Sequence, residues 1–325
     1  MVKAKAQFEK LKLSIPRKYA SFERIERSVG DFMTGTKNCA YIFDCVGGEN
    51  QDSKFGFWVG DGMKDMYDGM ACGVGGELLY DNLSVAVSVS NVLFSIQIRE
   101  SSDIYYSMEC HNCSNLFACV GLRNKKYCIL NKQYTKEEYE VLLRKIIKHM
   151  TDLPYVDGTG KVFPFGEFFP PEFSSFAYNA TIAQEYFPIN KAEALERGYR
   201  WKNKEERNYK IDIKNSEIPD DIKDTDESMI NKVIECLHKG DCDEQCTEAF
   251  KIVPEEFSFY KRMNLPLPRF CPNCRHYQRL KQRNPLNLWH RKCMKEGCSN
   301  EFETTYAPER PEIIYCEKCY QQEVY

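Results

Sequence analysis

The chain has 325 residues, of which 42% are hydrophobic and 29% are charged, with 20 Tyr and 20 Phe. This composition excludes wholesale disorder, and the length predicts two or three domains, because single cores usually stop growing at about 250–300 residues. The net charge of −3 excludes a polycation, so any nucleic-acid binding must come from a local patch. No stretch approaches the roughly 18 uncharged apolar residues of a membrane helix, and the first ten residues lack an apolar signal core. We therefore expect a soluble, cytoplasmic protein without a membrane partner.

The 16 cysteines are the exceptional feature of the composition. In a cytosol that keeps thiols reduced, such a count predicts metal binding rather than disulfides. Seven of them lie in residues 39–128 and nine in residues 236–319, with none between, which indicates at least two structural regions. The predicted organisation has four ranges: an N-terminal segment (1–29), repeats with a capping helix (30–150), an irregular Pro/Phe-rich region with an acidic linker (151–229), and two tandem zinc ribbons (230–325).

A degenerate repeat runs through residues 30–130. Short apolar and aromatic runs recur about every 12 residues and are joined by Gly, Asn, Asp and Ser. Such a short period predicts stacked strands and turns, and hence a mainly β fold with a β-helix or solenoid in this region. We expect two repeat units per turn, because 12 residues are few for one turn. A β-sandwich or barrel is the alternative.

The repeat also predicts which side chains point inward. One residue at the same place in each unit is expected to face the core: Ala40, Phe55, Tyr67, Leu79, Leu93, Tyr105 and Phe117. Buried inward positions are also expected for Cys39, Cys45, Cys72, Cys119 and Cys128, because a lone thiol behaves as a small hydrophobe.

A helix is expected to close the solenoid. Thr135 and Glu138 form a capping box, and apolar residues from Tyr139 to Met150 then recur at helical spacing. A second, short helix is expected at 191–197, ending before Gly198.

Two quartets of cysteines dominate the C-terminal third. Two thiols separated by two to four residues can turn toward one ion, and two such pairs complete the tetrahedron that zinc prefers. The predicted ligands are Cys242, Cys246, Cys271 and Cys274 for one zinc, and Cys293, Cys298, Cys316 and Cys319 for the other. This grouping predicts two zinc ions per chain, each structural because no ligand position is left open.

The sequence leaves some ligand assignments open. Phe250 and Phe302 each follow the second cysteine of a quartet by four residues, which favours this grouping and places a Phe under each metal. In the competing grouping, the pair at 271 and 274 joins the pair at 293 and 298. Cys236 or His238 could replace a ligand of the first quartet. Cys110 and Cys113 have metal-binding spacing but no partner pair.

A basic run overlaps the quartets, because no Asp or Glu occurs in residues 257–295. Cationic side chains interleaved with aromatic rings suit phosphate contact and base stacking, so we expect single-stranded RNA or DNA to bind here. The predicted nucleic-acid contacts are Arg275, Tyr277, Arg279, Lys281, Arg283, Trp289 and Arg291. In the alternative interpretation these cations only offset the negative charge of the zinc–thiolate centres.

Three segments carry a resemblance to a known family: residues 115–134, 178–187 and 310–324. They resemble an uncharacterised family of proteins with Cys/Tyr-rich repeats and zinc ribbons from bacteria of the candidate phyla radiation. The resemblance spans nearly the whole chain, which resembles a short version with fewer repeats. Residues 246–275 also resemble a widespread zinc-ribbon domain, whose first cysteine pair has two intervening residues where this chain has three. The resemblance implies zinc binding and supplies no catalytic residues.

Catalytic motifs are not found: the chain lacks a phosphate-binding loop, an H-E-x-x-H motif and a G-x-S-x-G motif. We therefore expect a non-enzymatic protein whose zinc ribbons, a class of zinc finger, engage nucleic acid, and no small-molecule substrate. The first alternative is a protein-interaction scaffold with purely structural zinc. The second is a β-helix enzyme acting on a glycan through the cluster of Asp61, Lys64, Asp65 and Asp68.

Overall fold

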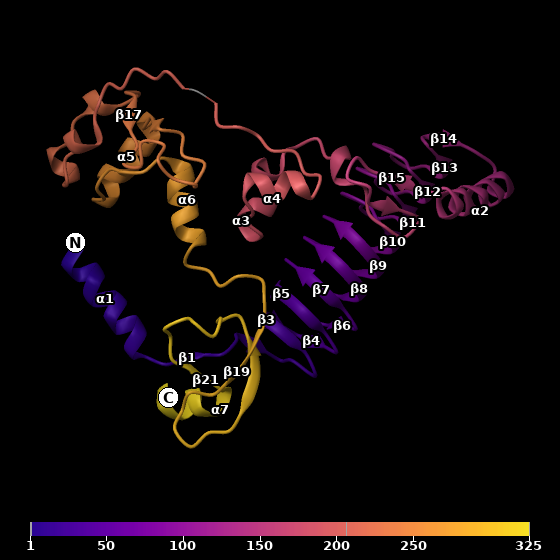
Figure 1. Cartoon of the computed structure of the whole chain (residues 1–325), viewed down its shortest axis with the longest axis horizontal. Helices are drawn as coiled ribbons and strands as arrows, with labels where there is room; N and C mark the ends of the chain where they lie inside the picture. Colours follow the sequence, from indigo (N-terminus) through magenta and orange to yellow (C-terminus); the bar gives the residue numbers. More distant parts are fainter. Residues whose placement is uncertain (1, 206, 325) are drawn as a thin grey trace. The chain divides into compact units, whose positions relative to one another are not determined.

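The computed structural model describes residues 2–205 and 207–324, which form two compact units (Figure 1). The solenoid unit comprises Met1–Ser175, Glu196–Tyr199 and Pro285–Tyr325, and the ribbon unit comprises Phe176–Leu195 and Arg200–Asn284. The two cysteine quartets thus belong to different units, although the sequence places them in tandem. Among the described residues, no helix is both long and apolar enough to cross a membrane.

The solenoid is a stack of parallel strands, as the 12-residue repeat predicts (Figure 1). The main strands are β2 (Phe22–Glu23), β3 (Val29–Thr34), β5 (Ala40–Cys45), β7 (Lys54–Phe57), β8 (Met63–Met70), β9 (Gly76–Leu83), β10 (Val89–Leu93), β11 (Ser102–Tyr105), β12 (Ser114–Phe117) and β13 (Lys126–Ile129). Two short strands, β4 (Thr36–Lys37) and β6 (Asn50–Gln51), pair beside them, and β14 (Lys132–Gln133) closes the stack antiparallel to β13.

Each repeat unit makes one full turn, so the expectation of two units per turn is wrong. Val92 of β10 aligns with Ile104 of β11, which aligns with Leu116 of β12, and these residues are 12 apart. Such a short turn closes because the backbone bends at every third residue, where φ is positive, as at Phe94, Gln97 and Glu100. Left-handed backbone is uncommon outside glycine, and asparagine and aspartate tolerate it best, which explains their frequency in the repeat.

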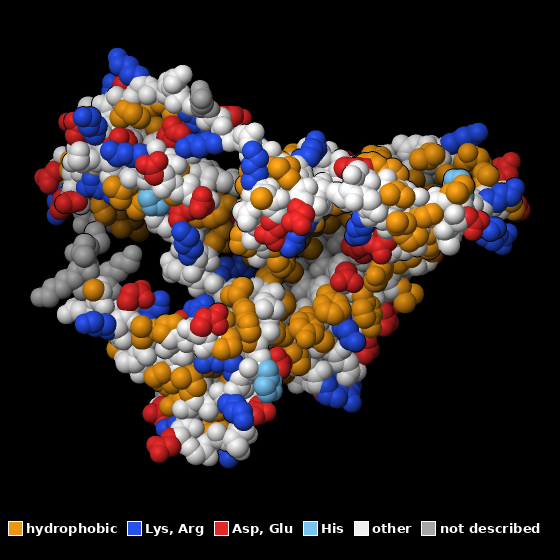
Figure 2. Space-filling model, viewed as in Figure 1, with side chains coloured by type: hydrophobic (Ala, Val, Ile, Leu, Met, Phe, Trp, Pro, Cys, Tyr) orange, Lys and Arg blue, Asp and Glu red, His pale blue; other side chains and the backbone are white. Residues whose placement is uncertain are grey.

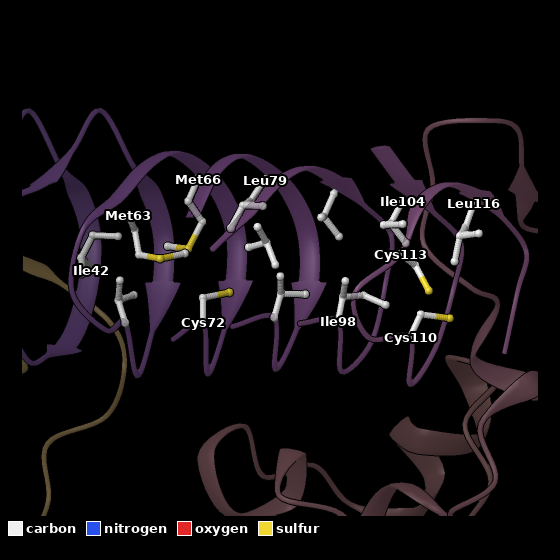
Figure 3. Packing of buried hydrophobic residues seen from close by; sticks show 14 of the residues in the cluster. Ile42, Met63, Met66, Cys72, Leu79, Ile98, Ile104, Cys110, Cys113 and Leu116 are labelled. Carbon is white, nitrogen blue, oxygen red and sulfur yellow. The ribbon is translucent and has the colours of Figure 1, made fainter. Parts of the chain in front are cut away.

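The core follows the same three-residue period. A buried side chain occurs at every third position through the later turns: Val89, Val92, Ser95, Ile98, Ser101, Ile104, Ser107, Cys110, Cys113, Leu116 and Cys119. Figure 3 shows such side chains, among them Met66, Leu79 and Ile98, pointing into the interior between the strands. Each turn therefore buries one side chain in every three residues, and the two residues that follow each buried one have side chains outside the solenoid core.

This period corrects the predicted inward row. Leu79 is buried as expected, but Phe55 and Tyr67 are 52% and 37% exposed. Phe117 is buried on the outside of the solenoid, in an aromatic cluster with Tyr106 and Tyr139. The predicted register was wrong because the aromatic residues mark the outer face beside the core position. The inward row is Met66, Leu79, Val92, Ile104, Leu116 and Cys128.

The solenoid cysteines lie in the core, as predicted for Cys39, Cys45, Cys72, Cys119 and Cys128. Several of these cysteines occupy positions that are serine in neighbouring turns, where the side chain accepts a hydrogen bond from a backbone amide of the next turn. The amide of Cys119 donates to the hydroxyl of Ser107 at 3.0 Å, and the amide of Asn131 donates to the thiol of Cys119 at 3.4 Å. Burial raises the pKa of Cys119 to about 11, which keeps it a thiol at neutral pH.

Cys110 and Cys113, whose role the sequence left open, also lie in this core. The amide of Cys113 donates to the hydroxyl of Ser101 at 3.0 Å. Among the described residues, neither thiol belongs to a group of side chains that could hold a metal ion.

Both ends of the solenoid are covered within its own unit. At one end lies helix α2 (Lys136–Asp152), whose predicted capping box between Thr135 and Glu138 is confirmed. Beyond it lie β15 (Tyr155–Val156), β16 (Val162–Phe163) and the 3-10 turn η1 (Pro171–Phe173). Residues 163–171, with four Phe and three Pro, form a Phe/Pro-rich segment that runs from the end of β16 to the start of η1.

At the other end lies the second cysteine quartet, with β19 (Trp289–Lys292), β20 (Glu301–Thr304), β21 (Ile314–Tyr315) and α7 (Glu317–Val324). Strand β21 pairs with β1 (Arg17–Lys18), which follows helix α1 (Val2–Ser14). The hydroxyl of Thr305 donates to the buried carboxylate of Asp31 at 2.6 Å, which ties this end to the first turns.

The ribbon unit is built from short elements around the first cysteine quartet. Residues 176–284 contain η2 (Tyr178–Ala180), α3 (Ala183–Tyr186), α4 (Lys191–Glu196), η3 (Asn215–Glu217), η4 (Ile222–Asp224), η5 (Glu227–Met229), β17 (Ile234–Glu235), β18 (Ala249–Phe250), α5 (Pro254–Met263) and α6 (Pro272–Leu280). Ile218, Ile222 and Met229 are buried against Phe250 and Phe257. The acid-rich stretch interpreted from the sequence as a linker thus contributes apolar side chains to this core.

Candidate metal centres

The second quartet forms a compact group of four thiols. The sulfur atoms of Cys293, Cys298, Cys316 and Cys319 all lie within 4.8 Å of one another. The Sγ atoms of Cys298 and Cys316 are 3.9 Å apart, close to the edge of about 3.8 Å in a tetrahedron with 2.3 Å zinc–sulfur bonds. These are the four ligands that the sequence predicts, and they could hold one metal ion.

Local structure positions these thiols. Cys293 follows strand β19 directly, and Cys316 immediately precedes helix α7. The amide of Cys316 donates to the sulfur of Cys293 at 3.3 Å. Although burial raises the pKa of Cys316, hydrogen bonds from Asn300 and Cys319 lower it to about 6. A thiol of low pKa supplies a thiolate, which is the form that binds metal.

The first quartet differs from the prediction at one corner. Cys246, Cys271 and Cys274 come together as expected, but the fourth sulfur within 4.8 Å of all three belongs to Cys236. The Sγ atom of Cys236 lies 3.9 Å from that of Cys274, and the Sγ atoms of Cys246 and Cys271 are 4.0 Å apart. Cys242, the expected fourth ligand, lies beside Cys274 in an adjoining group.

A comparison of the two ribbons explains why Cys236 takes this corner. Cys236 follows strand β17 directly, as Cys293 follows β19. It accepts a hydrogen bond from the amide of Cys271 at 3.2 Å, as Cys293 does from Cys316. The strand that precedes the first cysteine of each ribbon therefore identifies Cys236 as the ligand. The prediction of Cys242 rests only on its spacing from Cys246 in the sequence.

The Phe residues follow the predicted duplication. Phe250 lies in β18, which pairs with β17, and Phe302 lies in β20, which pairs with β19. Each Phe packs in one hydrophobic cluster with the cysteines of its own ribbon. The unit common to both ribbons is a strand, a cysteine, a second cysteine with its Phe strand, and a final cysteine pair at the start of a helix.

The basic run is largely paired with acids from elsewhere in the chain. Arg275 lies 3.7 Å from Glu256, and Lys281 forms an ion pair with Glu244. The guanidinium of Arg291 donates to the carbonyl of Ala307 at 3.2 Å. Further pairs link Lys292 to Glu301, Lys295 to Glu323 and Arg269 to Asp220.

The predicted nucleic-acid contacts are divided between the two units. Arg275, Tyr277, Arg279, Lys281 and Arg283 belong to the ribbon unit, whereas Trp289 and Arg291 belong to the solenoid unit. Arg283 lies over the ring of Tyr186, with 5.2 Å from its guanidinium carbon to the ring centroid. The hydroxyl of Tyr277 is buried. A nucleic-acid interface at these residues stays a prediction.

The solenoid exposes a group of aromatic rings that are not among the predicted nucleic-acid contacts. This open aromatic face consists of Tyr41, Phe55, Tyr67 and Tyr80, which are 46%, 52%, 37% and 41% exposed. Tyr41 and Phe55 align in one row on successive turns, and their rings stack with centroids 5.4 Å apart. Tyr67 and Tyr80 align in the neighbouring row on the next two turns. Hydrophobic side chains gather over the solenoid strands in Figure 2.

The same side of the solenoid is covered on the later turns. Phe94 and Tyr106 continue the row of Tyr41 and Phe55, and they are only 3% and 8% exposed. The ring of Phe165 contacts both of them, with centroids 6.1 and 6.0 Å apart, and the ring of Phe169 contacts Tyr106 at 5.7 Å. The chain thus covers part of this side with its own Phe/Pro-rich segment and leaves the open aromatic face bare.

Two aspartates lie next to Tyr67 and Tyr80, on the same turns. Asp68 and Asp81 occupy the outward positions between Phe55 and Phe94 on successive turns. Burial and the neighbouring carboxylates of Asp68 and Glu167 raise the pKa of Asp81 to about 6. Because the folded state disfavours the charged form, the contribution of Asp81 to stability falls as the pH rises from about 4 to 6.

Replacing Asp81 with Asn is therefore expected to stabilise the protein at pH 7. Asparagine tolerates the positive φ of this position and removes the buried charge. We expect about 1–2 kcal/mol of added unfolding free energy at pH 7 and no gain at pH 3.5, measured by urea unfolding. The matched control Asp65→Asn changes an exposed aspartate that also has positive φ, and its effect should be small at both pH values. A gain for Asp81→Asn that is equal at pH 3.5 and 7 would contradict this explanation.

Comparisons with family models, curated proteins and solved structures give no match, so the resemblance to the candidate-phyla-radiation family stays a prediction.

Proposed function

We propose that the protein is a zinc-stabilised binding scaffold whose open aromatic face takes a Phe/Pro-rich segment of a partner protein. One observation carries the proposal: the chain's own Phe/Pro-rich segment covers the same side of the solenoid on the turns that directly follow the open aromatic face. The covered turns provide a template for what the bare turns bind.

Structural zinc is the first part of the proposal. Four thiolates in tetrahedral arrangement suit zinc, and a site with four protein ligands leaves no position for a substrate. The sulfur–sulfur distances of 3.9 and 4.0 Å in the two quartets support this assignment. Around Cys293, Cys316 and Cys319 the local core is small, so metal is expected to supply much of the folding energy of that ribbon.

The covering segment indicates how a partner would bind. The backbone of two adjacent residues in its turn forms hydrogen bonds with the Tyr106 hydroxyl. The amide of Gly166 donates to this hydroxyl at 3.0 Å, and the hydroxyl donates to the carbonyl of Glu167 at 3.0 Å. Its phenylalanine rings meet the solenoid rings at their edges. A partner segment with a similar turn, aromatic residues and prolines can form both kinds of contact with the rings and hydroxyls of Tyr67 and Tyr80.

Charge defines the partner further. Asp68 and Asp81 lie in the row beside Tyr67 and Tyr80, and in the covering segment an acidic residue, Glu167, raises the pKa of Asp81 further. A partner segment with Lys or Arg at that place would neutralise the aspartates instead. The preferred partner is therefore a segment that combines Phe and Pro with one cation.

Two synthetic peptides test the proposal on the full chain. One has the sequence of residues 161–171, and the other carries Lys in place of Glu167. We expect the Lys peptide to bind more tightly at pH 7 in fluorescence anisotropy. The double variant Tyr67→Ala with Tyr80→Ala should weaken its affinity at least tenfold, about 1.4 kcal/mol, because both rings lie next to Asp68 and Asp81, which the Lys would contact. The control Val120→Ala changes an exposed side chain on another row and should leave the affinity unchanged.

Nucleic acid is the competing ligand, and one feature favours it. In the ribbon unit, a pocket of about 870 Å³ is lined by Trp201 and four cations, Lys191, Lys202, Lys204 and Arg207, and also by Glu193, Glu205 and Asp243. An aromatic ring among cations suits a base and its phosphates. A labelled single-stranded RNA is therefore the second probe. If RNA binds, loses affinity in Trp201→Ala and neither peptide binds, the scaffold proposal is overturned in favour of nucleic-acid binding.

A further inference from the structure

The first ribbon contains an insertion that the second lacks. Nine residues lie between Cys236 and Cys246, against four between the equivalent Cys293 and Cys298. The insertion carries three potential metal ligands, His238, Cys242 and Glu244. Together with Cys274 of the first quartet, their donor atoms all lie within 4.8 Å of one another.

The distances in this group fit a second tetrahedron. The Sγ atoms of Cys242 and Cys274 are 3.8 Å apart, the edge of about 3.8 Å expected for two zinc–sulfur bonds. The Nδ1 atom of His238 lies 3.2 Å from the Oε2 atom of Glu244, against about 3.3 Å for a zinc-bound nitrogen and oxygen.

The donor atoms that His238 and Glu244 direct into this group are buried and lack hydrogen bonds. Glu244 is 5% exposed, and neither its Oε2 atom nor the Nδ1 atom of His238 has a hydrogen-bond partner among the described residues. A buried carboxylate oxygen without a partner is costly, because it has lost its hydration. The two atoms approach each other without hydrogen-bond geometry, as ligands of one cation do.

The surroundings orient both ligands. The ammonium of Lys281 binds the other oxygen of Glu244, Oε1, which leaves Oε2 directed into the group. The ring of His238 packs edge-on against Phe270, with centroids 4.8 Å apart. Such contacts from outside the ligand set fix the direction of metal ligands in proteins. They also give Lys281, a predicted nucleic-acid contact, a role inside the ribbon.

We propose that the first ribbon holds two divalent metal ions that share the thiolate of Cys274. One ion is bound by Cys236, Cys246, Cys271 and Cys274. The second, zinc by the preference of this donor set, is bound by His238, Cys242, Glu244 and the same Cys274. Binding releases the thiol protons to solvent, and no oxidation or reduction takes place. Five thiolates and one carboxylate on two such ions carry the same net charge as four thiolates on one. The chain then binds three zinc ions rather than two.

Native mass spectrometry of the full chain purified in the presence of zinc tests this count. We expect three zinc ions in the unaltered protein and two in both Glu244→Gln and Cys242→Ser, because each variant removes a ligand of the second ion alone. The control Glu248→Gln alters a neighbouring carboxylate that pairs with Lys204 outside the group, and it should keep three.

Cadmium NMR gives a readout that needs no variant. Protein loaded with ¹¹³Cd should show three resonances, two from four-sulfur sites and one shifted upfield by nitrogen and oxygen ligands. Two zinc ions in the unaltered protein, with two ¹¹³Cd resonances, would overturn the proposal. It would equally be overturned if Cys242→Ser kept a single zinc, since Cys242 would then belong to the four-sulfur site.

Discussion

Replacing Cys316 with Ser is expected to release one metal ion per chain and to unfold residues 289–324. The hydrophobic cluster around Cys293, Cys316 and Cys319 includes few other side chains, chiefly Phe302 and Tyr315. Structural zinc supplies about 10–16 kcal/mol in isolated zinc fingers, far more than a cluster of this size can offer. Hydrogen exchange should show lost protection in β19, β20 and α7, whereas the solenoid strands β8 to β12 keep theirs.

The matched control for this variant is Cys119→Ser. The same chemical change is made at a buried thiol, but its row in the solenoid already contains Ser95 and Ser107, whose hydroxyls accept the equivalent hydrogen bonds. We expect full metal content and a small change in stability. A Cys316→Ser protein that retains its metal and its exchange protection would show that the second quartet is not a structural metal site.

Shortening Leu116 to Ala is expected to lower the free energy of unfolding of the solenoid by about 3–5 kcal/mol. Leu116 is fully buried between Ile104 and Cys128 of the neighbouring turns, so its removal leaves a cavity that the stacked backbone cannot close. Urea unfolding followed by circular dichroism measures the change.

Leu78→Ala is the matched control, because it makes the same deletion at a side chain that is 55% exposed. It should change stability by less than about 0.5 kcal/mol. Equal losses for the two variants would contradict the three-residue period, since that period is what places Leu116 inside and Leu78 outside.

The solenoid could be predicted from the sequence, but its cross-section could not. The 12-residue spacing of aromatic runs predicts the stacked strands and equals one turn, although we expected each turn to contain two units. The register failed because the most hydrophobic residues, such as Phe55 and Tyr67, face outward, whereas Ser95 and Ser107 face inward. A search for small, aliphatic or Cys residues at every third position, with Asn or Asp before the next one, would have found the inward row.

The metal centres were predictable from cysteine spacing except at one ligand. The insertion at 237–245 separates Cys236 from its partner in sequence and puts Cys242 closer to Cys246, so spacing alone selects the wrong neighbour for the four-sulfur group. The basic run misled for a similar reason. Its partners Glu244, Glu256 and Glu301 lie outside residues 257–295, and only the fold brings them together.

Photo-crosslinking tests the central claim, that the open aromatic face binds a Phe/Pro-rich segment of a partner protein. The Lys-substituted peptide, with benzoylphenylalanine in place of one Phe, is irradiated with the full zinc-loaded chain, and the attachment sites are mapped by mass spectrometry. We expect the crosslinks to be confined to residues 41–81. They should be lost in the double variant Tyr67→Ala with Tyr80→Ala. Crosslinks around Trp201, or crosslinks that persist in the double variant, would contradict this claim.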